Sequence, residues 1–190
     1  RATAPVAADF AAGWNQLGNP YTTATDITGA QVAVGGTTCD LATSNANGYT
    51  TDYFWAYDSF TRSYQLISAM FSFARTTVRK GEGFFFLANR SGKLILPQPG
   101  AAAASTPPAV SAKPAAGEWT LRLVARGEGG ADTDNFLGVC AAAAAHGEVC
   151  SPPVGQGGVD LYFPGLSGRR ATAFVDSLGA GQQWDLRVAS

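Results

Sequence analysis

Charge and histidine are what this sequence has least of. Charged residues make up 14 % of its 190 residues, and it contains one histidine, one methionine and three cysteines. The formal net charge is −1, so no strong field exists to gather nucleic acid or anionic lipid. No uninterrupted apolar run approaches the ~20 residues that cross a bilayer. We therefore expect neither a nucleic-acid partner nor a membrane span.

The scarce histidine and cysteine do not form a known catalytic or metal-binding pattern. His146 is the only histidine, and no Cys-x-x-Cys pair is present, which argues against a zinc site. His146 lies among alanines, and the chain has no Gly-x-Ser-x-Gly motif that would present an activated serine. We expect no catalytic residue, no required cofactor and a protein that is not an enzyme.

The three cysteines suggest one covalent link. Cys140 and Cys150 are separated by nine residues, a spacing that a short loop closes with a disulfide in an oxidising compartment. Two buried free thiols are the alternative. Cys39 is left over, and we interpret it as a buried thiol or as half of a bond between chains.

Aromatic residues reach 11 % and hydrophobic residues 46 %, too apolar for a disordered chain. Trp119, Leu121 and Leu123 alternate with polar residues, which is the period of a β-strand. Glycine and proline interrupt such segments at short intervals, as in β-sandwiches. The sequence predicts an all-β fold, with further strands at Tyr53–Tyr57, Tyr64–Leu66, Phe84–Ala88, Gln31–Val34, Lys93–Leu96, Val159–Phe163, Thr172–Asp176 and Gln183–Val188.

One composition break divides the chain. Residues 98–117 combine four prolines with small residues and no aromatics, which favours an extended connector. We expect two β-sandwich-like modules, at 10–97 and 118–190, joined by this Pro/Ala-rich linker. Residues 1–9 are expected to form an N-terminal arm.

Pairs of aspartates are the candidates for carboxylate chemistry. Asp52 and Asp58, or Asp132 and Asp134, are spaced so that they could act on a glycosidic bond. Aspartate is also common in turns, where its side chain accepts hydrogen bonds from nearby amides, and we favour that interpretation. Asp132 and Asp134 form a weak candidate Ca²⁺ site, since the closing glutamate of an EF-hand loop is absent.

Two aromatic clusters are the candidates for binding. Their strands carry aromatic side chains on both faces, and large exposed apolar patches are rare on monomers. One face should form the core, which is the assignment we favour for Trp55 and Phe85. The other face, with Phe54, Phe84 and Phe86, is predicted to contact another subunit. Trp55 and Tyr57 are the alternative candidates, as a platform for sugar rings.

Several short motifs resemble accessory β-modules of exported bacterial peptidases and surface proteins. Their pattern runs "GWNLIGNPY", "W-x-YD" and "PGxGFWV", followed by a segment with "W-x-L-x-L", "PP", "YF" and "W-x-L-x-V". The stretch before the two prolines is usually acidic in that pattern and here is Cys140–Cys150, which weakens the case for an ion site. The matching segments are Gly13–Tyr21, Phe54–Asp58, Lys80–Phe86, Leu94–Pro97, Trp119–Ala125, Asp134–Gly138, Pro152–Pro153, Leu161–Phe163 and Trp184–Val188.

These observations together predict a non-catalytic, exported structural subunit of a bacterial cell-surface or extracellular assembly. Its partners would be protein subunits, most simply further copies of itself. The N-terminal arm or the linker could lie along a neighbour as an added strand. The alternative function is a carbohydrate-binding or accessory module of a secreted hydrolase.

Overall fold

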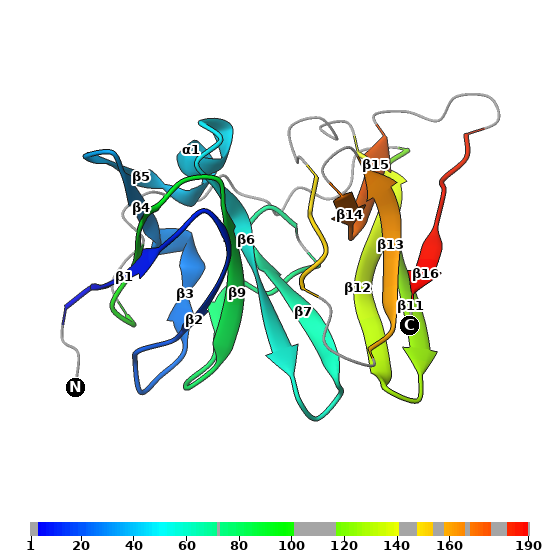
Figure 1. Ribbon diagram of the computed structural model, residues 1–190, viewed down its shortest axis with the longest axis horizontal. Coiled ribbons are helices and arrows are strands. Elements are labelled where there is room, and N and C mark those ends of the chain that lie inside the picture. The colour runs from blue at the N-terminus through cyan, green and yellow to red at the C-terminus, as the bar shows by residue number, and fades with distance from the viewer. Residues whose placement is uncertain are drawn as a thin grey trace. The chain divides into compact units, whose positions relative to one another are not determined.

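The computed structural model describes residues 4–71, 73–100, 117–140, 148–153, 158–165, 168–175 and 182–189. The fold is all-β, as predicted, with 57 % of the described residues in strands and 6 % in helices. Contacts divide the chain into two compact units, which are described separately (Figure 1). Unit 1 comprises Arg1–Tyr57 with Leu66–Ser111, and unit 2 comprises Asp58–Gln65 with Ala112–Ser190.

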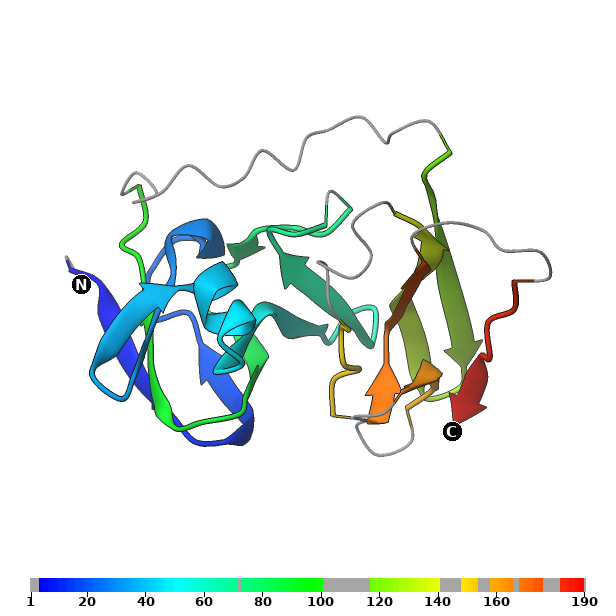
Figure 2. The same cartoon turned by 90° about the horizontal axis from the view of Figure 1, so that it is seen from above.

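Unit 1 is built on two four-stranded sheets with the strand orders β1-β10-β4-β5 and β2-β9-β6-β7. A two-stranded sheet, β3-β8, and the short helix α1, drawn in cyan in Figure 2, complete it. Within these two sheets, the pairings β1–β10, β2–β9 and β6–β9 are antiparallel. The elements are β1 (Val6–Phe10), β2 (Gly13–Gly18), β3 (Thr25–Asp26), a 3-10 turn (Ile27–Gly29), β4 (Gln31–Val34), β5 (Thr37–Asp40), α1 (Leu41–Ala46), β6 (Thr50–Asp58), β7 (Ser63–Ser68), β8 (Thr77–Val78), β9 (Gly83–Ala88) and β10 (Gly92–Leu96).

The core of unit 1 takes side chains from both large sheets. Val32 and Leu94 come from one sheet, and Phe54, Phe84 and Phe86 come from the other. Phe84 and Phe86 alternate along β9 with half-buried residues, as expected when only every second side chain of a strand points inward. These residues exclude water from a single apolar layer, and that layer is the main source of stability for unit 1.

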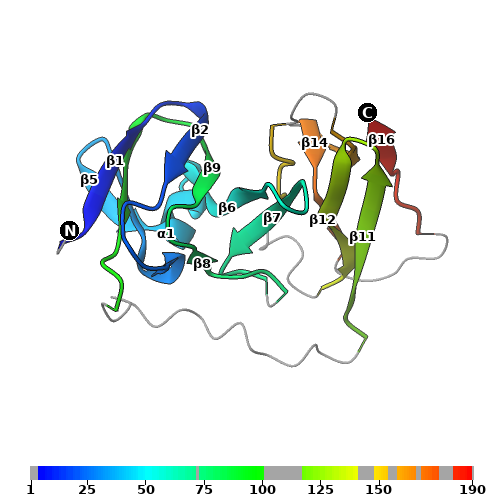
Figure 3. The same cartoon turned by 90° about the horizontal axis from the view of Figure 1, so that it is seen from below.

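Unit 2 contains two three-stranded sheets, with the orders β11-β12-β15 and β14-β13-β16 (Figure 3). A hairpin joins β11 to β12, and Gly127 pairs with Gly130 across a turn of two residues. β12 and β15 are parallel. The strands are β11 (Trp119–Gly127), β12 (Gly130–Val139), β13 (Asp160–Gly165), β14 (Gly168–Arg170), β15 (Thr172–Val175) and β16 (Arg187–Ala189).

Three parts of the chain differ from the sequence prediction. The strand predicted at Gln183–Val188 forms only at Arg187–Ala189, as β16. Val6–Phe10, most of which was assigned to the N-terminal arm, forms β1 and pairs along its whole length with β10. Asp132 and Asp134, interpreted as turn residues, lie inside the ten-residue strand β12. The linker prediction falls mainly on residues 101–116, which lie outside the described residues.

No helix in the described residues has both the length and the apolarity needed to cross a lipid bilayer.

Candidate functional site

The three phenylalanines predicted to form an interface are core residues. Phe54, Phe84 and Phe86 are each at most 1 % exposed within the chain itself. The Phe54 and Phe84 rings stack with centroids 4.6 Å apart, and Phe86 meets Phe54 edge-on at 5.3 Å. The predicted interface is therefore wrong. Alternation separates the two faces of a strand, but it does not reveal which face the second sheet covers.

The predicted sugar platform is also wrong. Trp55 pairs with Phe85 across β6 and β9 and is 1 % exposed, so its ring is closed to a sugar. Tyr57, at the end of the same strand, is 47 % exposed. Aromatic platforms for sugars need exposed ring faces, and this pair presents only one accessible ring.

No disulfide joins Cys140 and Cys150. The Cys140 amide donates to the carbonyl of Val175, whereas Cys150 forms a β-bridge with Arg170. The two cysteines thus contact opposite ends of one segment, which spans up to ~16 Å when extended. A disulfide needs Cα atoms about 4.4–6.8 Å apart, so the predicted link does not form.

Cys39 is the third free thiol and lies in β5, half-buried. Burial raises the pKa of its thiol, and the neighbouring Asp40 carboxylate adds to this effect. Asp40 itself caps α1 by accepting a hydrogen bond from the Thr43 amide at 2.7 Å. A raised pKa leaves Cys39 mostly protonated, so the structure favours the buried-thiol interpretation over a reactive one.

The two aspartates of the candidate Ca²⁺ site have separate protein partners. Asp134 Oδ1 accepts a hydrogen bond from Arg122 at 2.6 Å, and Asp132 Oδ2 accepts one from the Leu161 amide at 2.8 Å. The β11–β12 register shifts at this point, which interrupts the alternation that would place both carboxylates on one face. Within the described ranges, no three His, Cys, Asp or Glu side chains gather as metal ligands. Both carboxylates thus have partners within the fold, and the Ca²⁺ site stays a prediction.

Burial raises the pKa of Asp132, and the charge of nearby Asp160 raises it further. Asp160 is itself buried and forms an ion pair with Arg169. These groups form a polar cluster at the start of β13. His146, the residue we considered for catalysis, lies outside the described residues.

Asp58 is the turn residue that the sequence predicts. Its Oδ1 accepts hydrogen bonds from the amides of Phe60 at 2.9 Å and Thr61 at 3.2 Å. Its second oxygen accepts one from Gln65 at 3.3 Å. Both oxygens are thus used to close the β6–β7 hairpin, which leaves Phe60 at its tip 96 % exposed.

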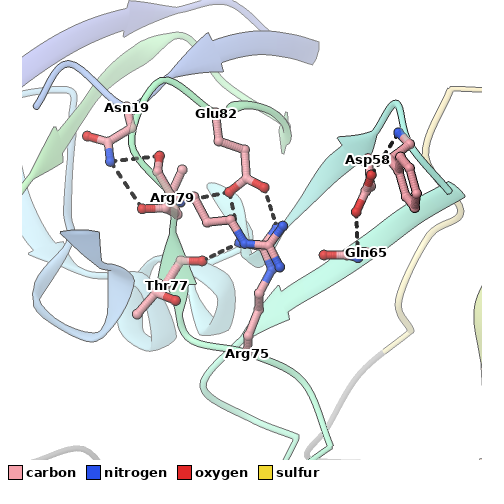
Figure 4. Close-up of polar contacts among 9 residues, drawn as sticks. Asn19, Asp58, Gln65, Arg75, Thr77, Arg79 and Glu82 are labelled. Carbon is pink, nitrogen blue, oxygen red and sulfur yellow. Dashed lines mark hydrogen bonds and ion pairs between the residues drawn. The ribbon is translucent and has the colours of Figure 1, made fainter. Parts of the chain in front are cut away.

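A second polar cluster stabilises the β8–β9 connection of unit 1. The Arg75 guanidinium donates to both oxygens of Glu82, at 2.7 and 2.8 Å, and to the Thr77 carbonyl at 2.6 Å (Figure 4). Burial by itself would raise the pKa of Glu82, but the Arg75 and Arg79 hydrogen bonds and charges lower it below its ordinary value. The side-chain Nδ2 of Asn19 donates hydrogen bonds to the carbonyls of Val78 and Arg79. Every one of these contacts satisfies the backbone or a neighbouring charge, so the cluster is structural.

Asp52 is the least satisfied carboxylate in unit 1. Its residue is 7 % exposed, and its Oδ1 has no hydrogen-bond partner. Burial raises the pKa of Asp52 to about 6, against the opposing effect of hydrogen bonds from its own amide and the Asn45 side chain. It lies where the β6–β9 register shifts, between Thr50 and Phe54. The sequence pairs Asp52 with Asp58, but these residues have different partners and Asp58 is used in the turn.

Strand β11 carries three large apolar side chains that are exposed to solvent. Trp119, Leu121 and Val124 are 38, 49 and 46 % exposed. Across the described residues, β11 pairs only with β12, at the end of its sheet. Trp119 makes an edge-on contact with Trp184 at 6.1 Å within unit 2, and no described strand pairs with the outer side of β11. Sequence alternation predicts this strand; its position at the edge depends on the order of pairing.

No known family, curated protein or solved structure matches this chain.

Proposed function

We propose that this chain is a non-catalytic structural subunit that assembles with further subunits through the free edge of β11. The observation that carries the proposal is a nine-residue edge that no other strand of the described residues pairs with, together with its three exposed apolar side chains. Such an edge carries unsatisfied amide and carbonyl groups and readily accepts another strand. Natural monomers protect such edges with charges, bulges, proline or short length. β11 carries Arg122 and Arg126 and a register shift between Leu123 and Ala125, but it is long and contains no proline.

The proposal replaces the surface that the sequence predicted but keeps its function. Phe54, Phe84 and Phe86 no longer support assembly, because unit 1 buries them itself. A non-catalytic role is supported by the use of Asp58, Asp132 and Asp134 as hydrogen-bond or ion-pair partners within the fold. An exported, cell-surface setting rests on the motif resemblance alone and stays a prediction.

Light scattering coupled to size-exclusion chromatography of the full chain tests this function. We expect the mass to rise with protein concentration, above that of one chain. Leu121→Lys places a charge on the edge and should return the protein to a monomer, with unchanged far-UV circular dichroism. Phe73→Lys is the matched control, because Phe73 is also an exposed apolar residue, 39 % exposed, but belongs to unit 1 rather than to the unit that contains β11.

A strictly monomeric wild-type chain at the highest soluble concentration would overturn the proposal. Equal loss of association in both variants would also overturn it, because association would then depend on general surface apolarity. Association that persists in the Leu121→Lys variant would show that the interface lies outside β11.

A further inference from the structure

We propose that the strand added to β11 is β11 of a second copy, antiparallel to the first and related to it by a two-fold axis through Leu123. This inference rests on the proposed function and names its partner and register. The two copies would form one continuous sheet in the order β15-β12-β11 followed by β11-β12-β15. The assembly ends at two copies, because each copy uses the same strand edge to bind the other.

Strand geometry restricts the possible registers. Residues directly opposite each other in an antiparallel pair lie on the same face of the sheet. A two-fold axis perpendicular to the sheet leaves every side chain on its original face. The axis must therefore pass between one residue of the first copy and the same residue of the second copy. Centring on Leu123 is the choice that pairs the whole strand, from Trp119 opposite Gly127 inward. Centring on Leu121 or Ala125 leaves four of the nine residues without partners.

Charge excludes the two neighbouring registers. An axis through Arg122 places that residue opposite itself, and an axis through Val124 places Arg122 opposite Arg126. Like charges directly opposite each other destabilise a sheet. The Leu123 register places Arg122 opposite Val124 and Arg126 opposite Thr120. Within its own copy, Arg122 donates to Asp134 at 2.6 Å and to the Thr133 carbonyl at 2.6 Å, which reduces the repulsion in the two disfavoured registers without removing it.

The same register covers the exposed apolar side chains. Leu121 faces Ala125 of the other copy, and the two Leu123 side chains face each other. Trp119 faces Gly127, where it meets the Val159 side chain, whose Cγ2 atom lies 2.6 Å from the position of a Cβ at Gly127. Val124 faces the aliphatic part of Arg122, whose carbon stem packs on apolar surface while its charged end stays in water. The Leu121–Ala125 pair matches a large side chain with a small one, and the Leu123 pair brings two leucines together.

Cysteine cross-linking reads this register directly. In the full chain, Cys39, Cys140 and Cys150 are replaced by serine, and one new cysteine is introduced on β11. Copper–phenanthroline serves as the oxidant. We expect Leu123→Cys to cross-link with itself at least about tenfold faster than Val124→Cys, because only self-opposed residues reach disulfide distance. Thr120→Cys and Arg126→Cys should each cross-link poorly alone but rapidly when the two variants are mixed.

The outcomes separate this inference from the proposed function. If the chain associates but Val124→Cys or Leu121→Cys cross-links as fast as Leu123→Cys, the two-fold register is wrong while assembly through β11 stands. If light scattering shows only monomers, both fail. Should the serine background lose its circular dichroism signal, mass spectrometry of cross-linked peptides in the wild-type background identifies which residues are joined.

Discussion

Asp52 shows how a single residue can act against the stability of its own fold. The carboxyl is buried, one of its oxygens has no partner, and its pKa is raised to about 6. An ionised carboxylate is disfavoured in such surroundings unless a cation or several donors compensate. Its hydrogen-bond donors are its own amide and Asn45. Asp52 therefore lowers the stability of unit 1 whenever it is ionised.

The sign of this effect gives a pH prediction. The folded pKa of about 6 lies above the ordinary 3.8, so the native state holds its proton more tightly and stability falls as pH rises between these values. The full penalty, on the order of 3 kcal/mol, is present above pH 6. Asp52→Asn should raise the free energy of unfolding at pH 7.5 by about 1–3 kcal/mol and flatten its dependence between pH 4 and 7.

Urea unfolding of the full chain at several pH values measures this change. Asp9→Asn is the control, because it removes the same charge from a side chain that is 82 % exposed. Equal stability of Asp52→Asn and the wild type at pH 7.5 would show that ionisation of Asp52 does not destabilise the native protein.

Pairing between elements depends on close approach of their backbones, and the β11–β12 hairpin is the clearest case. A Cβ atom at Gly138 would lie 2.1 Å from the carbonyl oxygen of Trp119 and 3.1 Å from Cα of Thr120. Gly138 pairs directly with Thr120. Only a residue without a side chain lets β11 approach β12 at this position. The edge proposed for assembly thus depends on one glycine in the neighbouring strand.

We expect Gly138→Ala to destabilise unit 2 by about 2–3 kcal/mol, because the added methyl group forces the two backbones apart. Gly83→Ala is the matched control. It also lies in a paired strand, but its added Cβ would be 3.6 Å from the nearest atom, an ordinary contact. Urea unfolding followed by tryptophan fluorescence distinguishes the two variants. Equal midpoints would show that β11 moves aside without loss of packing.

At the scale of the whole molecule, the two units differ in how much apolar surface they bury. Among the described residues, the unit 1 core contains sixteen buried hydrophobic side chains. Unit 2 has a smaller set, namely Phe136, Val139, Val149, Leu161, Phe163 and Ala171. Buried apolar area is the main source of stability, and parts of a chain with less of it open more often.

We therefore expect backbone amides in β11 and β13 to exchange with deuterium faster than those in β6 and β9. Hydrogen–deuterium exchange with peptide mass spectrometry measures this on the intact chain. Repeating it at low and high protein concentration adds a link to the assembly proposal, since pairing of β11 should slow its exchange selectively. Equal protection in both units would contradict the expected difference.

The sequence alone determined the fold class, many strands and several turns of this protein. Gln31–Val34 and Thr172–Val175 form strands where alternation predicts them, and Asp58 closes the predicted hairpin. These features depend on contacts within a few residues or on a period of two. Strand β12 was missed because Asp132 and Asp134 are typical of turns, and their partners, Leu161 and Arg122, are distant in the chain.

The tertiary structure alone decided which faces and edges are hidden. Alternation marks two faces on β6 and β9, but the position of the second sheet places Phe54, Phe84 and Phe86 inside. The order of pairing, rather than any local pattern, leaves β11 at an edge. The distance between Cys140 and Cys150 depends in the same way on the strands that each one contacts. Burial and edge position arise from contacts between distant segments, which a local pattern does not encode.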